Sequence, residues 1–153
     1  METNEKIKVY EALLPRLEAL MDGETDWVAA MANFAAEVHE SLNFFWTGFY
    51  RVHNGQLILG PFQGPVACTR IAYGRGVCGT AWKEKQTLVV PDVHLFPGHI
   101  ACSSLSESEI VVPVFDERRE VCAVLDIDSR TKNTFDDTDR KYLERAVTFL
   151  PRF

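Results

Sequence analysis

Late in the chain, the apolar segment Val121 to Asp128 carries two carboxylates two residues apart. Because side chains alternate between the two faces of a β-strand, we expect Asp126 and Asp128 on one face. The other face is wholly apolar and would pack on the core, with Val121, Ala123, Leu125 and Ile127. Two acids on one face attract a cation, or raise each other's pKa enough to keep a proton. The spacing alone favours an alternative, a strand that ends in solvent.

Cys102 lies in a long irregular segment, Pro91 to Ser108, before a strand that starts at Glu109. A loop of this length is usually functional or disordered, and its apolar residues argue against disorder. A cysteine among polar residues is modestly favoured as a reactive thiol. A second interpretation is a metal site, for which irregular spacing is a weak signal. Its ligands would be His94, His99 and Cys102, with Asp92 as a fourth.

The other cysteines have different surroundings. Cys78 follows a glycine-rich turn at an expected helix N-terminus, which would lower the pKa of its thiol. The alternative for Cys78 is a small buried residue in a tight turn. Cys68 falls in an expected strand over residues 66–71, and Cys122 in the apolar strand described above, so burial is expected for both.

Two aromatic residues, Trp46 and Tyr50, fall on the same face of an expected strand over residues 44–52. An aromatic strand usually belongs to the core. On one face, however, two such rings could also form the wall of a pocket.

The elements that must position these residues follow from periodicity and turn signals. Apolar residues at helical spacing predict helices over residues 6–21, 26–42 and 136–150, and Pro15 predicts a kink or break in the first. Asn54-Gly55 predicts a hairpin. Strands are expected over residues 44–52, 56–62, 66–71, 87–90, 109–115 and 121–128, with a short helix over 74–82. Short turns make neighbouring strands antiparallel. We therefore expect an α+β domain with its terminal helices on one face of the sheet and a ligand pocket on the other.

Composition narrows the class of protein. The chain has 153 residues, so one domain over 1–153 is expected. The net charge is −6, and the sequence has no cluster of basic residues of the kind that binds nucleic acids or anionic membranes. No apolar run has the length of a membrane helix or a signal peptide, which predicts a soluble, cytoplasmic protein. Four cysteines without a CxxC pair are too few for a disulfide scaffold and lack the spacing of a zinc knuckle.

Motifs around these residues resemble a known family. They are WTGFY (46–50), GPFQGPVACTRI (60–71), GVCG (76–79), VPDVHLFPGHIAC (90–102), SEIVVP (108–113) and LDIDS (125–129). Together they resemble the free methionine-(R)-sulfoxide reductases, which are single GAF domains, over essentially the whole chain. Ser103, where many relatives have an acid, and the extra Cys122 depart from the family pattern.

The resemblance implies reduction of the R-epimer of free methionine sulfoxide, with thioredoxin as reductant and no cofactor or resident metal. It implies Cys102 as the catalytic thiol and Cys68 as the main resolving thiol, with Cys78 as a third redox cysteine. It also implies a substrate pocket with Trp46, Glu109, Asp126 and Asp128, to which Tyr50 is added from its place on the same strand face as Trp46. A homodimer through the terminal helices is compatible with this arrangement. Ser103 leaves no acid to act at its position.

The residue types suit this chemistry. A thiolate at Cys102 would attack the sulfoxide sulfur and become a sulfenic acid, and Cys68 would close a disulfide with it. One of the three acids, held protonated, would supply a proton to the sulfoxide oxygen, while the others bind the substrate ammonium. We expect the long loop to move, because disulfide geometry requires nearby Cα atoms. The main alternative is a GAF domain that binds a small ligand without turnover.

Overall fold

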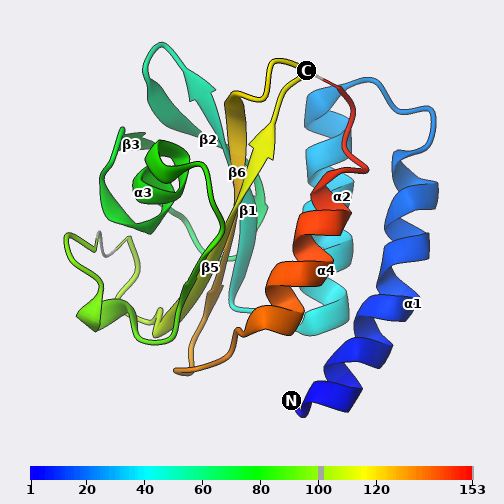
Figure 1. Ribbon diagram of the computed structural model, residues 1–153, viewed down its shortest axis with the longest axis horizontal. Coiled ribbons are helices and arrows are strands. Elements are labelled where there is room, and N and C mark those ends of the chain that lie inside the picture. The colour runs from blue at the N-terminus through cyan, green and yellow to red at the C-terminus, as the bar shows by residue number, and fades with distance from the viewer. Residues whose placement is uncertain (100–101, 153) are drawn as a thin grey trace.

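In the computed structural model, which describes residues 1–99 and 102–152, a six-stranded antiparallel sheet separates two unlike layers. The strand order is β3-β2-β1-β6-β5-β4. Figure 1 shows α1, α2 and α4 together on one face, with α3 and the long loops on the other. The α+β architecture expected from the sequence is confirmed. The elements are α1 (Thr3–Met21), α2 (Trp27–Leu42), β1 (Trp46–His53), β2 (Gln56–Gln63), β3 (Arg70–Ala72), α3 (Gly76–Glu84), β4 (Leu88–Val90), the 3₁₀ turn η1 (Val93–Leu95), β5 (Ser108–Phe115), β6 (Val121–Ser129) and α4 (Asp137–Val147).

Helix α1 runs unbroken through Pro15, so the break that proline suggested is not found. Pro15 lies on the exposed side of the helix, whereas its neighbours Leu13, Leu14 and Leu17 are buried. Burial of this apolar face stabilises the helix against the hydrogen bond that a proline removes. None of the helices in the described part of the chain is long and apolar enough to cross a membrane.

Strand β6 divides its side chains between the two layers. Ala123, Leu125 and Ile127 belong to the core under the helices. Val124 faces the opposite side, as the alternation predicts. The first two residues of β6 depart from that prediction: Val121 packs on the pocket side and Cys122 on the helix side. The reason is a register irregularity between Val114 and Phe115 of the partner strand, which shifts the pairing by one residue.

Cys68 lies outside a strand. The expected strand over residues 66–71 is reduced to β3, and the preceding residues form an irregular segment. Gly64, with a positive φ, and Pro65 follow the end of β2 and explain why the β3 ladder begins only at Arg70. The prediction of a buried strand cysteine at this position is therefore wrong: Cys68 is half-buried.

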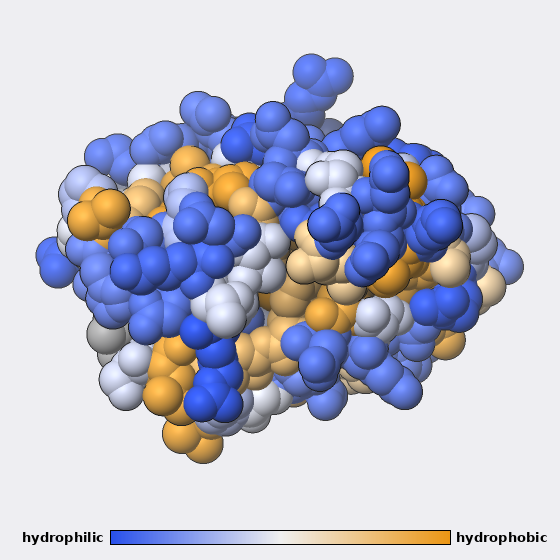
Figure 2. Space-filling view, turned by 90° about the horizontal axis from the view of Figure 1, so that it is seen from below, coloured by the Kyte–Doolittle hydropathy of each residue, from blue (hydrophilic) through white to orange (hydrophobic). Residues whose placement is uncertain are grey.

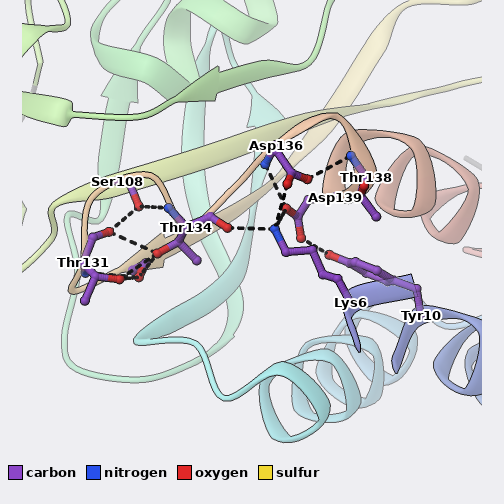
Figure 3. Close-up of polar contacts among 9 residues, drawn as sticks. Lys6, Tyr10, Ser108, Thr131, Thr134, Asp136, Thr138 and Asp139 are labelled. Carbon is purple, nitrogen blue, oxygen red and sulfur yellow. Dashed lines mark hydrogen bonds and ion pairs between the residues drawn. The ribbon is translucent and has the colours of Figure 1, made fainter. Parts of the chain in front are cut away.

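A buried polar cluster fastens the first helix to the last (Figure 3). Lys6, which is 6% exposed, lies 2.7 Å from Asp139 and 3.3 Å from Asp136. The Tyr10 hydroxyl donates to the other Asp139 oxygen at 2.7 Å. Asp136 and Asp139 also form the capping box that starts α4. The Lys6 ammonium donates to the carbonyl of Thr134, which ties the cluster to the turn after β6.

The same turn reaches the strand that carries Glu109. The buried Ser108 hydroxyl donates to the Thr131 carbonyl at 2.6 Å and lies near the Thr134 amide (Figure 3). Ser108 pairs with Ser129 across the β5–β6 ladder, one position before the pair Glu109 and Asp128. The helix layer thus supports the part of the sheet from which the acids project.

Candidate functional site

A cavity with an internal volume of about 50 Å³ lies on the sheet face opposite α1, α2 and α4. The structure brings seven of the predicted site residues to its wall: Trp46, Tyr50, Cys78, Cys102, Glu109, Asp126 and Asp128. Cys68, the eighth, is bonded to one of them. The cavity floor comes from the sheet. Its rim comes from α3, from residues 65–67 and from His99, Cys102, Ser103 and Ser106.

Three acids meet on the floor of the cavity because two strands present them side by side. Glu109 of β5 pairs with Asp128 of β6, and Asp126 lies opposite Gly48 of β1 and Val111 of β5. Burial raises the pKa of all three carboxyl groups, and the proximity of Asp126 raises those of Glu109 and Asp128 further.

A hydrogen bond between the carboxyl groups of Glu109 and Asp126 shifts their two pKa values in opposite directions. It raises the pKa of Glu109 and lowers that of Asp126, so the shared proton is favoured on Glu109. One oxygen of Asp126, Oδ1, is buried and has no hydrogen-bond partner among the described residues. An unpaired buried carboxylate oxygen is costly and fits a cationic or hydrogen-bond-donating ligand.

Cys78 is buried behind the acids rather than poised as a thiolate. Cys78 lies in the first turn of α3, and its sulfur is 4.0 Å from Oε2 of Glu109. Burial, followed by the charges of Asp126 and Glu109, raises the pKa of the Cys78 thiol well above its usual range. The lowered pKa that a helix N-terminus would give is not found, because burial and the nearby acids outweigh the helix dipole.

A disulfide joins Cys68 to Cys102 at the cavity mouth, with their Cα atoms 5.4 Å apart. Cys102 is exposed and Cys68 half-buried. The bond links two segments separated by 34 sequence positions. Cys78 and Cys122 are free thiols. The structure thus has the long loop already in position for this bond.

The polar ends of two aromatic side chains hold the segment that carries Cys68. The Trp46 indole donates to the Pro65 carbonyl at 3.0 Å, and the Tyr50 hydroxyl donates to the Cys68 carbonyl at 2.8 Å. The Trp46 ring stacks on Phe62 with centroids 5.1 Å apart. A Cβ atom at Gly48 would lie 2.7 Å from the Trp46 ring, so only glycine leaves room for this stack. The aromatic pair therefore forms a wall and positions Cys68.

The residues of the alternative metal site are not assembled as that interpretation required. The Cys102 sulfur is bonded to Cys68. His94 pairs with Glu107 at 2.9 Å, and its amide donates to Asp92. His99 lies on the cavity wall, where burial and the charge of His94 lower the pKa of its imidazole.

Sequence reasoning missed several residues of the wall. Arg75 and Ser106 both line the cavity. Arg75 stands between two glycines immediately before α3, a context that indicates close approach of the backbone to a ligand. No comparable pattern marks Ser106.

Comparison with known proteins places this geometry in context. Residues 26–150 match the family model described as GAF domain. A GAF domain-containing protein A from Dictyostelium discoideum is 54% identical over 95% of this chain and 92% of its own length. The free methionine-R-sulfoxide reductase of Escherichia coli (strain K12) is 45% identical over 96% of this chain and 89% of its own.

A solved structure is also similar throughout. The free methionine-R-sulfoxide reductase from Neisseria meningitidis, in complex with its substrate, is 51% identical and superposes with a TM-score of 0.89. The match covers 92% of this chain and 84% of that one.

Proposed function

This chain belongs to the GAF-domain family of the free methionine-R-sulfoxide reductases, oxidoreductases that act on sulfur, and from that premise we propose how it works. It reduces the R-epimer of free methionine sulfoxide to methionine through a sulfenic acid on Cys102, which Cys68 resolves as a disulfide. The observation that carries this proposal is the Cys68–Cys102 disulfide at the mouth of a cavity whose floor holds three acids.

The first step forms the sulfenic acid. The Cys102 thiolate attacks the sulfoxide sulfur, the oxygen passes to Cys102, and the substrate leaves as the thioether. A proton must reach the sulfoxide oxygen as its bond to sulfur breaks. Glu109 suits that role because its raised pKa keeps it protonated next to Asp126.

The second step closes the disulfide. The Cys68 thiolate attacks the Cys102 sulfur, and the hydroxyl leaves as water after taking up a proton. In sum, one sulfoxide and two thiols give one thioether, one disulfide and one water. The short Cα separation and the anchoring of Cys68 by Tyr50 support this order of events.

Selectivity for the free amino acid follows from the charges on the wall. Asp126 and Asp128 face the cavity and would hold an ammonium group by charge-assisted hydrogen bonds. Arg75 offers a cation for the carboxylate. A methionine within a protein chain has neither charged group, so it would leave buried carboxylates unpaired.

We propose a thioredoxin-type dithiol as the reductant. The Cys102 sulfur belongs to an exposed residue, and three exposed apolar residues lie on the segments that carry the disulfide: Val66, Leu95 and Leu105. Figure 2 shows apolar residues exposed among hydrophilic ones over much of this face of the molecule, including the left of the view. Such residues favour contact with another protein.

The test is turnover of each epimer of free methionine sulfoxide with thioredoxin recycling. We expect loss of the R-epimer alone, with no turnover by Cys102→Ser. Cys68→Ser should complete one turnover, leaving a sulfenic acid, and then stop. Cys122→Ser is the matched control, because Cys122 is a free thiol remote from the cavity wall. Sustained turnover by Cys68→Ser would contradict the assignment.

A GAF domain that only binds a ligand is the second candidate, favoured by the fold it would share. It predicts that the parent binds the sulfoxide without converting it. Absence of any turnover by reduced parent protein, with binding retained, would establish this alternative.

A further inference from the structure

Three potential metal ligands face one another at the inner end of the cavity. They are the Cys78 sulfur and one carboxylate oxygen each from Glu109 and Asp126, all within 4.8 Å of one another. All three residues are buried. Asp126 is 6% exposed, and its Oδ1 has no hydrogen-bond partner among the described residues. A thiol and two carboxylates, one of which has a buried oxygen without a hydrogen-bond partner, form a candidate site for a cation.

We propose that Cys78, Glu109 and Asp126 bind a thiophilic divalent cation such as Zn²⁺ or Cd²⁺, in the space that the substrate ammonium would otherwise occupy. The site is not a resident cofactor centre but a place where an external cation blocks the cavity. Binding of the cation rests on the arrangement of these three side chains, whereas its competition with the substrate ammonium rests on the function proposed above.

The geometry is close to that of a zinc centre. With Zn–S near 2.3 Å and Zn–O near 2.1 Å, tetrahedral ligands lie about 3.6 Å apart. The Cys78 sulfur and Oε2 of Glu109 are 4.0 Å apart, so a shift of a few tenths of an ångström, on the order of a side-chain torsion adjustment, would bring them to bonding positions. Water from the cavity, or Asp128 beside Glu109, completes the fourth position.

The chemistry of the donor set selects the metal. Carboxylates alone would suit Mg²⁺ or Ca²⁺, whereas a thiolate favours softer ions. The cation replaces the protons of Cys78 and Glu109, so binding strengthens in mildly alkaline buffer. Among the other charged wall residues, Asp128 favours the cation, while Arg75 and, when protonated, His99 oppose it.

A second group, Asp92, His94 and Glu107, also has its ligand atoms within 4.8 Å of one another. It is already internally paired: His94 bonds to Glu107, and Lys132 lies 3.2 Å from Asp92. The His94 side chain is 56% exposed. These partners leave no unpaired buried ligand, so this group serves as the comparison in the test.

The experiment uses protein with the Cys68–Cys102 disulfide intact, which removes both of those sulfurs as ligands. Cd²⁺ or Zn²⁺ is titrated by calorimetry, and Cd²⁺ also by the near-ultraviolet absorption of a cadmium–thiolate bond. We expect one cation per chain and a thiolate band. Cys78→Ser should abolish the band and weaken binding at least about 100-fold, the upper end of the cost of losing an outer-shell partner.

Two control variants and one variant of the site itself complete the design. Cys122→Ser should bind like the parent because it removes the other free thiol, and His94→Gln should bind like the parent because it removes only the second group. Glu109→Gln, which keeps the shape of the site, should weaken binding without removing the band. Binding that survives Cys78→Ser, or that is lost in His94→Gln, would overturn the proposal, as would no binding by the parent.

Discussion

At the cavity floor, Glu109, Asp126 and Asp128 share too little space to be ionised together. Because burial raises the pKa of Glu109 above its value in the unfolded chain, the protonated carboxyl contributes stability at low pH. That contribution is complete below the unfolded pKa and is lost as the pH rises through the folded pKa. The free energy of unfolding therefore decreases as the pH rises through the titration range of these acids.

The corresponding prediction concerns Glu109→Gln. The free energy of unfolding of the parent should fall between mildly acidic and mildly alkaline pH, and that of the variant should fall less, since glutamine does not titrate. Urea unfolding across this pH range measures both. Glu84→Gln, on the exposed end of α3, is the control and should follow the parent. Parallel curves for parent and Glu109→Gln would contradict the pKa direction.

A second prediction at the residue scale concerns Tyr50. Tyr50→Phe keeps the ring on the wall but removes the hydrogen bond to the Cys68 carbonyl. One such bond contributes about 1 kcal/mol, so disulfide closure should slow roughly fivefold while sulfoxide reduction changes less. Rapid quenching with a thiol reagent separates the two steps. Slowing of sulfoxide reduction with unchanged disulfide closure would place Tyr50 in substrate binding alone and contradict this role.

Strand alternation was enough to predict that Asp126 and Asp128 share a face, and their position beside Glu109 follows once β5 and β6 pair. It could not predict the bond from Tyr50 to Cys68, because that contact depends on where an irregular segment returns to the sheet. The sequence also could not decide between the two interpretations of Cys78, because a thiol at a helix N-terminus has a lowered pKa only if it is not buried.

At the scale of elements, the ion pairs that connect α1 to α4 could not be predicted from the sequence. Lysine at the position of Lys6 looks like an ordinary exposed residue, and its burial depends on the capping box at the far end of the chain. The helices and most strands, by contrast, were predictable because their apolar periodicity and the Asn54-Gly55 turn are local signals. The strand expected over residues 66–71 was too long, because the segment before β3, which contains Cys68, is irregular.

The Lys6 cluster gives a stability prediction. Lys6→Met leaves Asp139, which is 1% exposed, without its cation and should cost about 3–5 kcal/mol of unfolding free energy. Chemical denaturation measures it. Arg16→Met is the matched control, because the Arg16–Glu37 pair is partly exposed and should be worth less than about 1 kcal/mol. Similar losses in both variants would mean that Lys6 acts only through packing of its methylene groups.

At the scale of the molecule, the free energy of unfolding should depend on the redox state of the Cys68–Cys102 pair. The Cys68–Cys102 bond closes a loop of 34 sequence positions, which in the chain-entropy description stabilises the oxidised protein by about 3–4 kcal/mol. Thermal or urea unfolding of the oxidised and reduced parent should show this difference. The double variant Cys68→Ser with Cys102→Ser should unfold identically with and without reductant. A difference that persists in the double variant would point to another thiol.

The division of β6 between two layers has a consequence for how this protein tolerates mutation. Substitutions at Ala123, Leu125 and Ile127 act on the helix-side core, whereas Asp126 and Asp128 line the cavity. A saturation library scored separately for cellular abundance and for growth on methionine sulfoxide should therefore show two interleaved patterns with a period of two residues. Odd positions would lose abundance, and the two acidic positions would lose growth while abundance is maintained or rises. One short strand would thus show the requirement for stability and the requirement for activity on alternate residues.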